Sequence, residues 1–321
     1  MRALFGHRFV RRIGRSVLVV WVAMSLVFVL SNLIGDPAIA TLGPRAHASQ
    51  IAQFRAAHGL DRPFYAQYLS YFGGMLRGDL GRSFRDDQPV LDVVLTRLPR
   101  TVLLGAMAMG FELLFGLGVG LVAALRRNTI VDTLAMSLSY LGASTPGFLI
   151  GLLVMQIFAF RLGWLPVGGY GLTATEHVEH ALLPSLTLAV VGAATYARIL
   201  RGELIETLRA DYVRTARSKG LSRARVVVVH AMRNAVLPII TLVGMSMPLL
   251  VGGAIVTETV FGWPGMGRLA YEATSSLDVP ILLGVVLMSA ITVQAGNLLA
   301  DVVVSRIDRR VKSDDDLPRR G

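Results

Sequence analysis

Long apolar runs alternate with charged connections along the whole chain. An α-helix rises about 1.5 Å per residue, so about 20 apolar residues cross the ~30 Å hydrocarbon core of a bilayer. Six segments reach or approach this length, and they predict an all-α polytopic membrane protein with six transmembrane helices. The predicted spans are residues 16–34, 101–125, 133–160, 181–197, 235–257 and 279–300.

The composition agrees with this pattern. Of the 321 residues, 53% are hydrophobic and 17% are charged, whereas soluble domains carry about 25% charged residues. The chain has no cysteine, which excludes a disulfide scaffold, thiol catalysis and cysteine-ligated metal sites. The net charge of +11 is concentrated in the connections between spans, which favours membrane topology over nucleic-acid binding.

The Lys and Arg residues predict which side of the membrane each connection faces. The N-terminus, the turn after the second span, the segment 198–233 and the C-terminal tail hold 22 of the 32 basic residues. Basic residues concentrate in cytoplasmic connections, so both termini are predicted to be cytoplasmic. The expected division is a cytoplasmic N-terminus with the first helix (1–34), an external region (35–100), a five-helix core (101–304) and a cytoplasmic tail (305–321).

The first span also has features of a secretory signal, namely a basic start and the sequence Ala38-Ile39-Ala40 behind it. Its uncharged run of 19 residues exceeds the usual signal core of about 7–15 residues. Removing the span would also place the arginine-rich segment 198–233 in conflict with one terminus. We therefore expect a retained membrane anchor.

The cytoplasmic segment 201–236 is far longer than a turn between two helices needs. Apolar positions recur in it at every fourth residue and predict one amphipathic helix: Leu204, Leu208, Tyr212 and Ala216. Gly220 follows as a helix stop, and Ser222 is placed to cap a second helix that runs to Met232. A helix pair held at the membrane face is suited to docking into a groove of a partner protein.

Three stretches resemble one family. Residues 211–221, followed by Asn234-Ala-Val-Leu-Pro238, resemble the coupling loop of ATP-binding-cassette (ABC) importer permeases, in the form of the dipeptide/oligopeptide and nickel branch. Residues 59–63 and 78–83 resemble the external region of that branch, and residues 258–267 resemble its last external loop. The external region after the first span is typical of the B-type of its two unlike permease subunits. The resemblance covers nearly the whole chain and implies a type I ABC importer fold.

The resemblance implies a permease without catalysis of its own. No G-x-x-x-x-G-K-[ST] motif occurs, so ATP and Mg are expected to bind a separate or fused ABC ATPase. The other expected partners are a second homologous permease, an external substrate-binding protein and the lipids of a bacterial inner membrane; no nucleic acid is expected. The implied ATPase-coupling residues are Asp211, Tyr212, Arg214, Ala216, Gly220 and Leu221. The implied external docking residues are Glu258, Phe261, Trp263, Pro264 and Gly265, beside the region 35–100.

Polar residues inside the predicted spans are candidates for the translocation path. They are Glu112, Gln156, Gln294 and Asn297. An ionised acid inside a span costs at least ~2.5 kcal/mol. Glu112 therefore either serves the path or a proton relay, or it pairs with a neighbouring helix or is partly exposed to a cavity. For the three amides, hydrogen bonding between helices is the alternative to a path role.

Two further alternatives stay open at this point. His177 and His180 could touch nickel transiently or belong to a solvated external turn, but their sequence matches no zinc-protease motif, and no resident metal site is predicted. An intramembrane enzyme using Glu112 or these histidines lacks a second acid at the level of Glu112 and a G-x-S-x-G motif. Short peptides are the favoured substrates, and nickel, glutathione and other small solutes remain open.

Overall fold

The computed structural model is helical, with no strand in residues 2–252 and 254–307, which are the residues that the structure describes. Residues 308–321 of the predicted cytoplasmic tail lie outside them. Four helices are long and apolar enough to cross a membrane, and six spans result if each of two bent helix pairs counts as one. The four lie in α1 (Arg2–Ile34), α5 (Val90–Leu125), α8 (Ala174–Thr207) and α15 (Val279–Ile307). The predicted all-α polytopic fold is confirmed.

The third predicted span is two helices. α6 (Ile130–Ser144) meets the continuous run of α7 (Gly147–Val154) and a π-helical turn, η1 (Met155–Arg161), at 108°. The residue before a proline is pushed out of the helical region, and Thr145 is extended, with ψ 132°, before Pro146. The segment predicted as one span over 133–160 is therefore bent at Thr145 and Pro146, and it counts as one span only if the two helices are taken together.

Two other prolines lie inside continuous helices. α8 continues through Pro184, and α12 (Leu237–Gly252) continues through Pro248. The second bent pair lies elsewhere: residues 223–235 and 237–244 meet at 44°.

The chain divides into two compact units. Among the described residues, the first contains 2–101 and 264–294, and the second contains 102–252, 254–263 and 295–307. The first unit holds α1, α2 (Pro37–Leu42), α3 (Ala48–Ala57), α4 (Phe64–Met75), the start of α5, α14 (Met266–Ser275) and most of α15. The second holds the rest of α5, α6 to α12, α13 (Ile255–Val260) and the end of α15.

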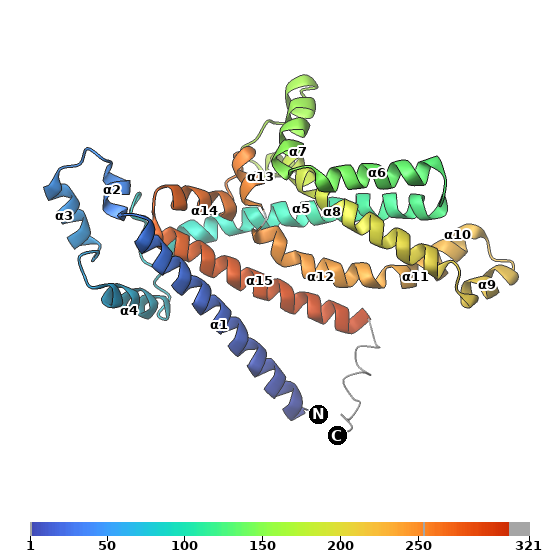
Figure 1. Cartoon of the computed structure of the whole chain (residues 1–321), viewed down its shortest axis with the longest axis horizontal. Coiled ribbons are helices and arrows are strands. Elements are labelled where there is room, and N and C mark those ends of the chain that lie inside the picture. The colour runs from blue at the N-terminus through green and yellow to red at the C-terminus, as the bar shows by residue number, and fades with distance from the viewer. Residues whose placement is uncertain (1, 253, 308–321) are drawn as a thin grey trace. The chain divides into compact units, whose positions relative to one another are not determined.

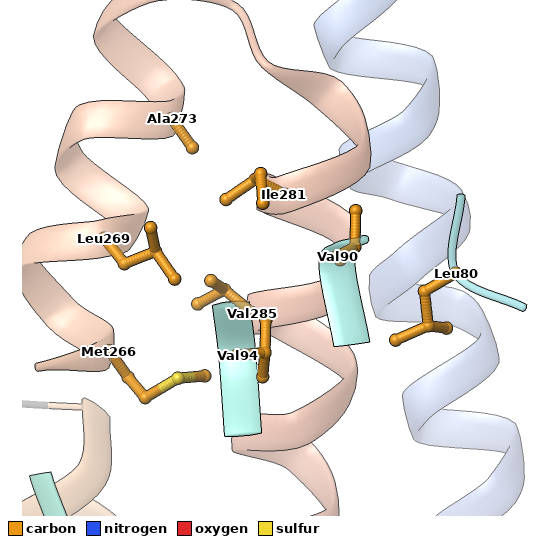
Figure 2. Close-up of a cluster of buried hydrophobic side chains, with 8 residues drawn as sticks. All are labelled: Leu80, Val90, Val94, Met266, Leu269, Ala273, Ile281 and Val285. Carbon is orange, nitrogen blue, oxygen red and sulfur yellow. The ribbon is translucent and has the colours of Figure 1, made fainter. Parts of the chain in front are cut away.

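The core of the first unit joins segments that lie far apart in the sequence. Figure 2 shows Met266 and Leu269 of α14 facing Val285 of α15, beside Val94 of α5. A buried polar contact adds to this core, because the hydroxyl of Ser83 donates to the carboxylate of Asp278 at 2.5 Å. The segment before α5 is thereby fixed to the turn that precedes α15.

Close helix packing shapes the second unit. α6 lies alongside α8 (Figure 1). Glycines on α5 let this helix approach α8 closely. A Cβ on Gly116 would lie 2.6 Å from Cβ of Tyr196, and a Cβ on Gly120 would lie 2.6 Å from the carbonyl oxygen of Ala197. Glycine at these positions permits backbone contact between the helices.

Candidate functional site

The segment 201–236 forms a helical hairpin at one end of α8 (Figure 1). The α8 helix ends at Thr207, and residues 208–210 separate it from α9 (Asp211–Ser218). After α9 the chain turns at Gly220, where φ is +74°. Ser222 then accepts a hydrogen bond from the backbone N–H of Arg225. The glycine stop and the serine cap are confirmed.

The returning arm of the hairpin consists of α10 (Arg223–Arg225), a π-helical turn, η2 (Val226–Ala231), and α11 (Met232–Ala235). The single amphipathic helix predicted through residues 204–216 is wrong, since α8 and α9 are separate helices. α9 buries Val213 and Ala216 against Val226 of the returning arm. That contact joins two separate segments of the chain, so the spacing of apolar residues within one helix does not predict it.

The two faces of α9 differ sharply. Val213 is 0% exposed and Ala216 is 6% exposed, and both pack into the hairpin. The opposite face is polar and exposed: Asp211, Arg214, Thr215, Arg217 and Ser218. Of the predicted coupling residues, Asp211, Tyr212, Arg214 and Gly220 are exposed, Leu221 is half-buried, and Ala216 faces inward. Val213 and Val226 were missed, although apolar residues at spacing 213 and 216 could have indicated the buried face.

A hydrogen bond braces the hairpin from outside its apolar core. The side-chain amide of Asn234 on α11 donates to the hydroxyl of Tyr212 on α9 at 2.7 Å. Tyr212 is 44% exposed, so its ring remains accessible. The hairpin is thus held at its tip by Gly220, in its middle by valine packing and at its base by this bond.

A cavity of about 600 Å³ lies in the second unit. Its lining comes from α5, α7, α8, α12, α13 and the residue before α13: Glu112, Gly147, Phe148, Thr187, Leu188, Val191, Gly192, Thr195, Tyr196, Leu242, Ser246, Ala254, Val256 and Thr257. Glu112 is the one charged residue in this set, and it is 7% exposed. The volume is in the range of small-molecule sites, about 300–1,000 Å³.

The other predicted path residues are placed differently. Gln156 is exposed on η1, and Asn297 is half-buried on α15. Gln294 accepts a hydrogen bond from the hydroxyl of Ser16 at 3.0 Å within the first unit. For Gln294, the alternative of hydrogen bonding between helices is therefore realised.

The residues expected to dock an external protein are mostly buried. Trp263 and Glu258 are 0% exposed and Phe261 is 3% exposed. Gly265 is also buried, and Pro264 is half-buried. A buried side chain offers no surface to a second protein, so in this chain Glu258, Phe261 and Trp263 support the loop from within, and Pro264 alone of the five keeps a partly exposed side chain.

Their packing explains the burial. The ring of Trp263 lies among Leu104, Ala181 and Ala254. Phe261 packs on Met155 and Leu183, and its carbonyl oxygen accepts from the backbone N–H of Gly169 at 2.9 Å. These aromatic residues hold the loop before α8 and the turn after α13 together.

The two histidines have a similar structural role. Nδ1 of His177 lies 2.8 Å from the carbonyl oxygen of Tyr170, whose ring stacks on the imidazole at 3.8 Å. Nδ1 of His180 lies 2.7 Å from the carbonyl oxygen of Gly168. Both histidines are half-buried and join the loop before α8 to that helix, so they do not form a solvated turn. Among the described residues, no group of three His, Cys, Asp or Glu could hold a metal ion.

Two protein-family models match this chain, one in its N-terminal third and one in the remainder. Residues 116–313 match the family described as "Binding-protein-dependent transport system inner membrane component", and residues 6–105 match its N-terminal counterpart. The glutathione transport system permease protein GsiC of Escherichia coli O6:H1 is 36% identical over 304 residues, which are 94% of this chain and 98% of that protein. The GsiC protein of Salmonella paratyphi A is 39% identical over 288 residues, 89% of this chain and 92% of that protein.

Solved structures share the fold. A chain of the MetNI methionine ABC transporter, in an inward-facing conformation, superposes with a TM-score of 0.56 at 16% identity. The match covers 67% of this chain and 96% of that chain. A second crystal form of the same transporter gives a TM-score of 0.57.

Proposed function

Because the chain belongs to the family of binding-protein-dependent transport system inner membrane components, we propose that it lines the translocation path of an ATP-driven importer for short peptides. The fold is that of type I ABC importer permeases. In this family the permease lies in the bacterial inner membrane, and separate subunits hydrolyse ATP. The proposal adds the substrate class, a second unlike permease, an external substrate-binding protein and cytoplasmic termini.

The hairpin of α9 and α11 is the observation that carries the proposal. Its exposed face presents Arg214 and Arg217, while its buried face is fixed by Val213 and Val226. A short helix held rigidly and left polar on its outer side can move as a lever when a partner grips it. We assign this contact to the ATPase subunit, so the hairpin lies in the cytoplasm in this proposal. The distribution of basic residues predicts the same side for the hairpin and for both termini.

The substrate class rests on the relatives and on the cavity. Relatives that align over nearly the whole chain are named glutathione permeases, and glutathione is itself a tripeptide. The cavity offers one carboxylate among hydroxyl and apolar side chains. Such a lining suits a small organic solute better than a nickel ion, which favours several imidazole or carboxylate ligands.

Affinity purification through a tag on this chain tests the assembly. An ATP-hydrolysing subunit should co-purify with the wild-type chain and be lost in the double variant Arg214→Glu, Arg217→Glu. The matched control is Arg77→Glu, Arg85→Glu, which makes the same charge change at exposed positions of the region 35–100. Unchanged co-purification in the α9 variant would contradict the assigned grip.

Uptake of labelled trialanine, glutathione and Ni²⁺ tests the substrate class. Cells that carry the intact transporter should accumulate trialanine or glutathione in an ATP-dependent way, and deletion of this chain should abolish the uptake. If the deletion affects only Ni²⁺ uptake, the peptide proposal is wrong.

A further inference from the structure

Glu112 is a buried carboxylate without a counter-charge. It projects from α5 into the cavity and is 7% exposed. Within the described part of the chain, no hydrogen bond or ion pair reaches its oxygens. Removing a carboxylate from water without a partner costs several kcal/mol. A binding partner from outside the chain would therefore be favoured at this position.

The position of the carboxylate is built into α8. A Cβ on Gly192 would lie 2.2 Å from Cδ of Glu112 and 2.4 Å from one of its oxygens. Only glycine at residue 192 leaves room for the carboxylate there. The acid thus occupies a space that the neighbouring helix reserves for it.

Three of the five hydroxyl side chains that line the cavity donate their protons to protein atoms other than Glu112. Tyr196 donates to the hydroxyl oxygen of Ser246 at 3.2 Å, and Ser246 donates to the carbonyl oxygen of Leu242 at 2.9 Å. Thr187 donates to the carbonyl oxygen of Leu183 at 2.9 Å. The three oxygens keep lone pairs available, so this part of the cavity combines hydrogen-bond acceptors with one negative charge.

This arrangement selects one kind of ligand group. A primary ammonium carries a positive charge and three donors, and it has no acceptor. A carboxylate ligand would meet like charge and find no free donor on these three hydroxyls. Apolar side chains such as Phe148, Leu188 and Val191 line the rest of the cavity, and they permit varied side chains on the ligand.

We infer that the Glu112 cavity binds the N-terminal ammonium group of the transported peptide. The inference rests on the proposed function, and it adds which end of the peptide this subunit recognises. Every unmodified peptide has such a group, so recognition of it is compatible with a permissive path.

Protection from a hydrophobic carbodiimide tests the inference on the wild-type protein. The complete transporter, purified through this chain into lipid nanodiscs, is treated with dicyclohexylcarbodiimide, and the adduct at Glu112 is measured by mass spectrometry. At a peptide concentration of about four times Kd the free site falls about fivefold. Trialanine should therefore slow modification of Glu112 about fivefold, while modification of exposed Glu206 on α8 should not change.

Two blocked peptides identify the group that is bound. Trialanine amide keeps the ammonium and lacks the carboxylate, so it should protect as well as trialanine. N-acetyl-trialanine lacks the ammonium and should give no protection. Equal protection by both blocked peptides, or protection by neither, would overturn the inference.

A matched pair of glycine variants tests the placement of the carboxylate. Gly192→Ala should weaken protection by trialanine, because the added methyl group displaces Glu112. In Gly118→Ala on α5, where a Cβ meets nothing within 4 Å, trialanine should protect Glu112 as well as it does in the wild type. Equal protection in both variants would contradict the placement. If ATPase subunits co-purify and trialanine is transported while protection fails, the inference is wrong and the proposed function stands.

Discussion

Asn234 and Tyr212 join the two arms of the α9 hairpin through a 2.7 Å hydrogen bond. The bond spans the turn at Gly220 and adds to the packing of Val213 on Val226. A hydrogen bond of this kind contributes about 0.5–1.5 kcal/mol. It stiffens the hairpin locally, which is the property that a lever between two subunits requires.

Tyr212→Phe should loosen the hairpin without unfolding the chain. The variant keeps the ring and loses about 1 kcal/mol, so amide hydrogen exchange in α9 should become about fivefold faster. Uptake per ATP hydrolysed should fall because less of the motion of α9 reaches the bundle. Tyr65→Phe, at an exposed tyrosine of α4, is the control. Unchanged exchange in α9 would show that the bond does not brace the hairpin.

The effect of a substitution at Gly220 should increase with the free-energy cost of placing the new residue in the left-handed backbone region. With φ at +74° and nothing within 4 Å of an added Cβ, the cost is conformational and not steric crowding. Alanine should cost about 1 kcal/mol, asparagine less and valine more. ATP hydrolysis and uptake, measured separately, should become uncoupled in the order Asn, Ala, Val. Normal transport in Gly220→Val would refute the coupling role of this turn.

Features that depend on local sequence could be predicted. The long apolar helices, the stop at Gly220 and the cap at Ser222 follow from residues within a few positions of each other. The break at Pro146 is equally local. Its angle of 108° is not, because α7 packs on α8 and α13, and no local pattern carries those contacts.

The candidate site could be predicted only in part. Glu112 was recognisable as a costly acid inside a span, but the cavity around it depends on helices up to 145 positions further along, as far as Thr257. The burial of the loop residues could not be predicted for the same reason. Trp263 and His177 lie in segments rich in glycine or polar residues, and their burial depends on Tyr170, which contacts both rings.

The ion pair between Arg201 and Asp132 should respond asymmetrically to mutation. Two contacts of 2.6 and 2.7 Å join the guanidinium on α8 to the carboxylate on α6. The side chain of Asp132 is 5% exposed and that of Arg201 is 29% exposed. Removing the arginine leaves a buried charge, whereas the arginine can still reach water if the acid is neutralised.

Arg201→Met should therefore lower the melting temperature of the solubilised chain more than Asp132→Asn. We expect a loss of about 2–3 kcal/mol for Arg201→Met, below the usual range for fully buried pairs because Arg201 is partly hydrated. Arg209→Met, at an exposed position just after α8, serves as the control and should change little. Equal losses in the two test variants would mean that the pair is not effectively buried.

The start of the region 35–100 should loosen in acid through Asp36. Burial alone would raise the pKa of this carboxyl, but the hydrogen bonds from Arg55 and from the backbone N–H of Ala38 outweigh it and hold the pKa below its usual 3.8. A carboxyl with a depressed folded pKa stabilises the fold above its unfolded pKa, and this contribution disappears as the pH falls through the folded value. The contacts of α2 with α3 should therefore weaken below about pH 4.

Hydrogen exchange in residues 37–57 measures this effect. Between pH 5 and pH 3, corrected for intrinsic rates, protection should fall in the wild type by less than about 1 kcal/mol, since Arg55 is 45% exposed and such pairs are partly screened by water. Asp36→Asn should show the lower protection already at pH 5 and no further acid step. An acid step of the same size in Asp36→Asn would assign the titration to another group.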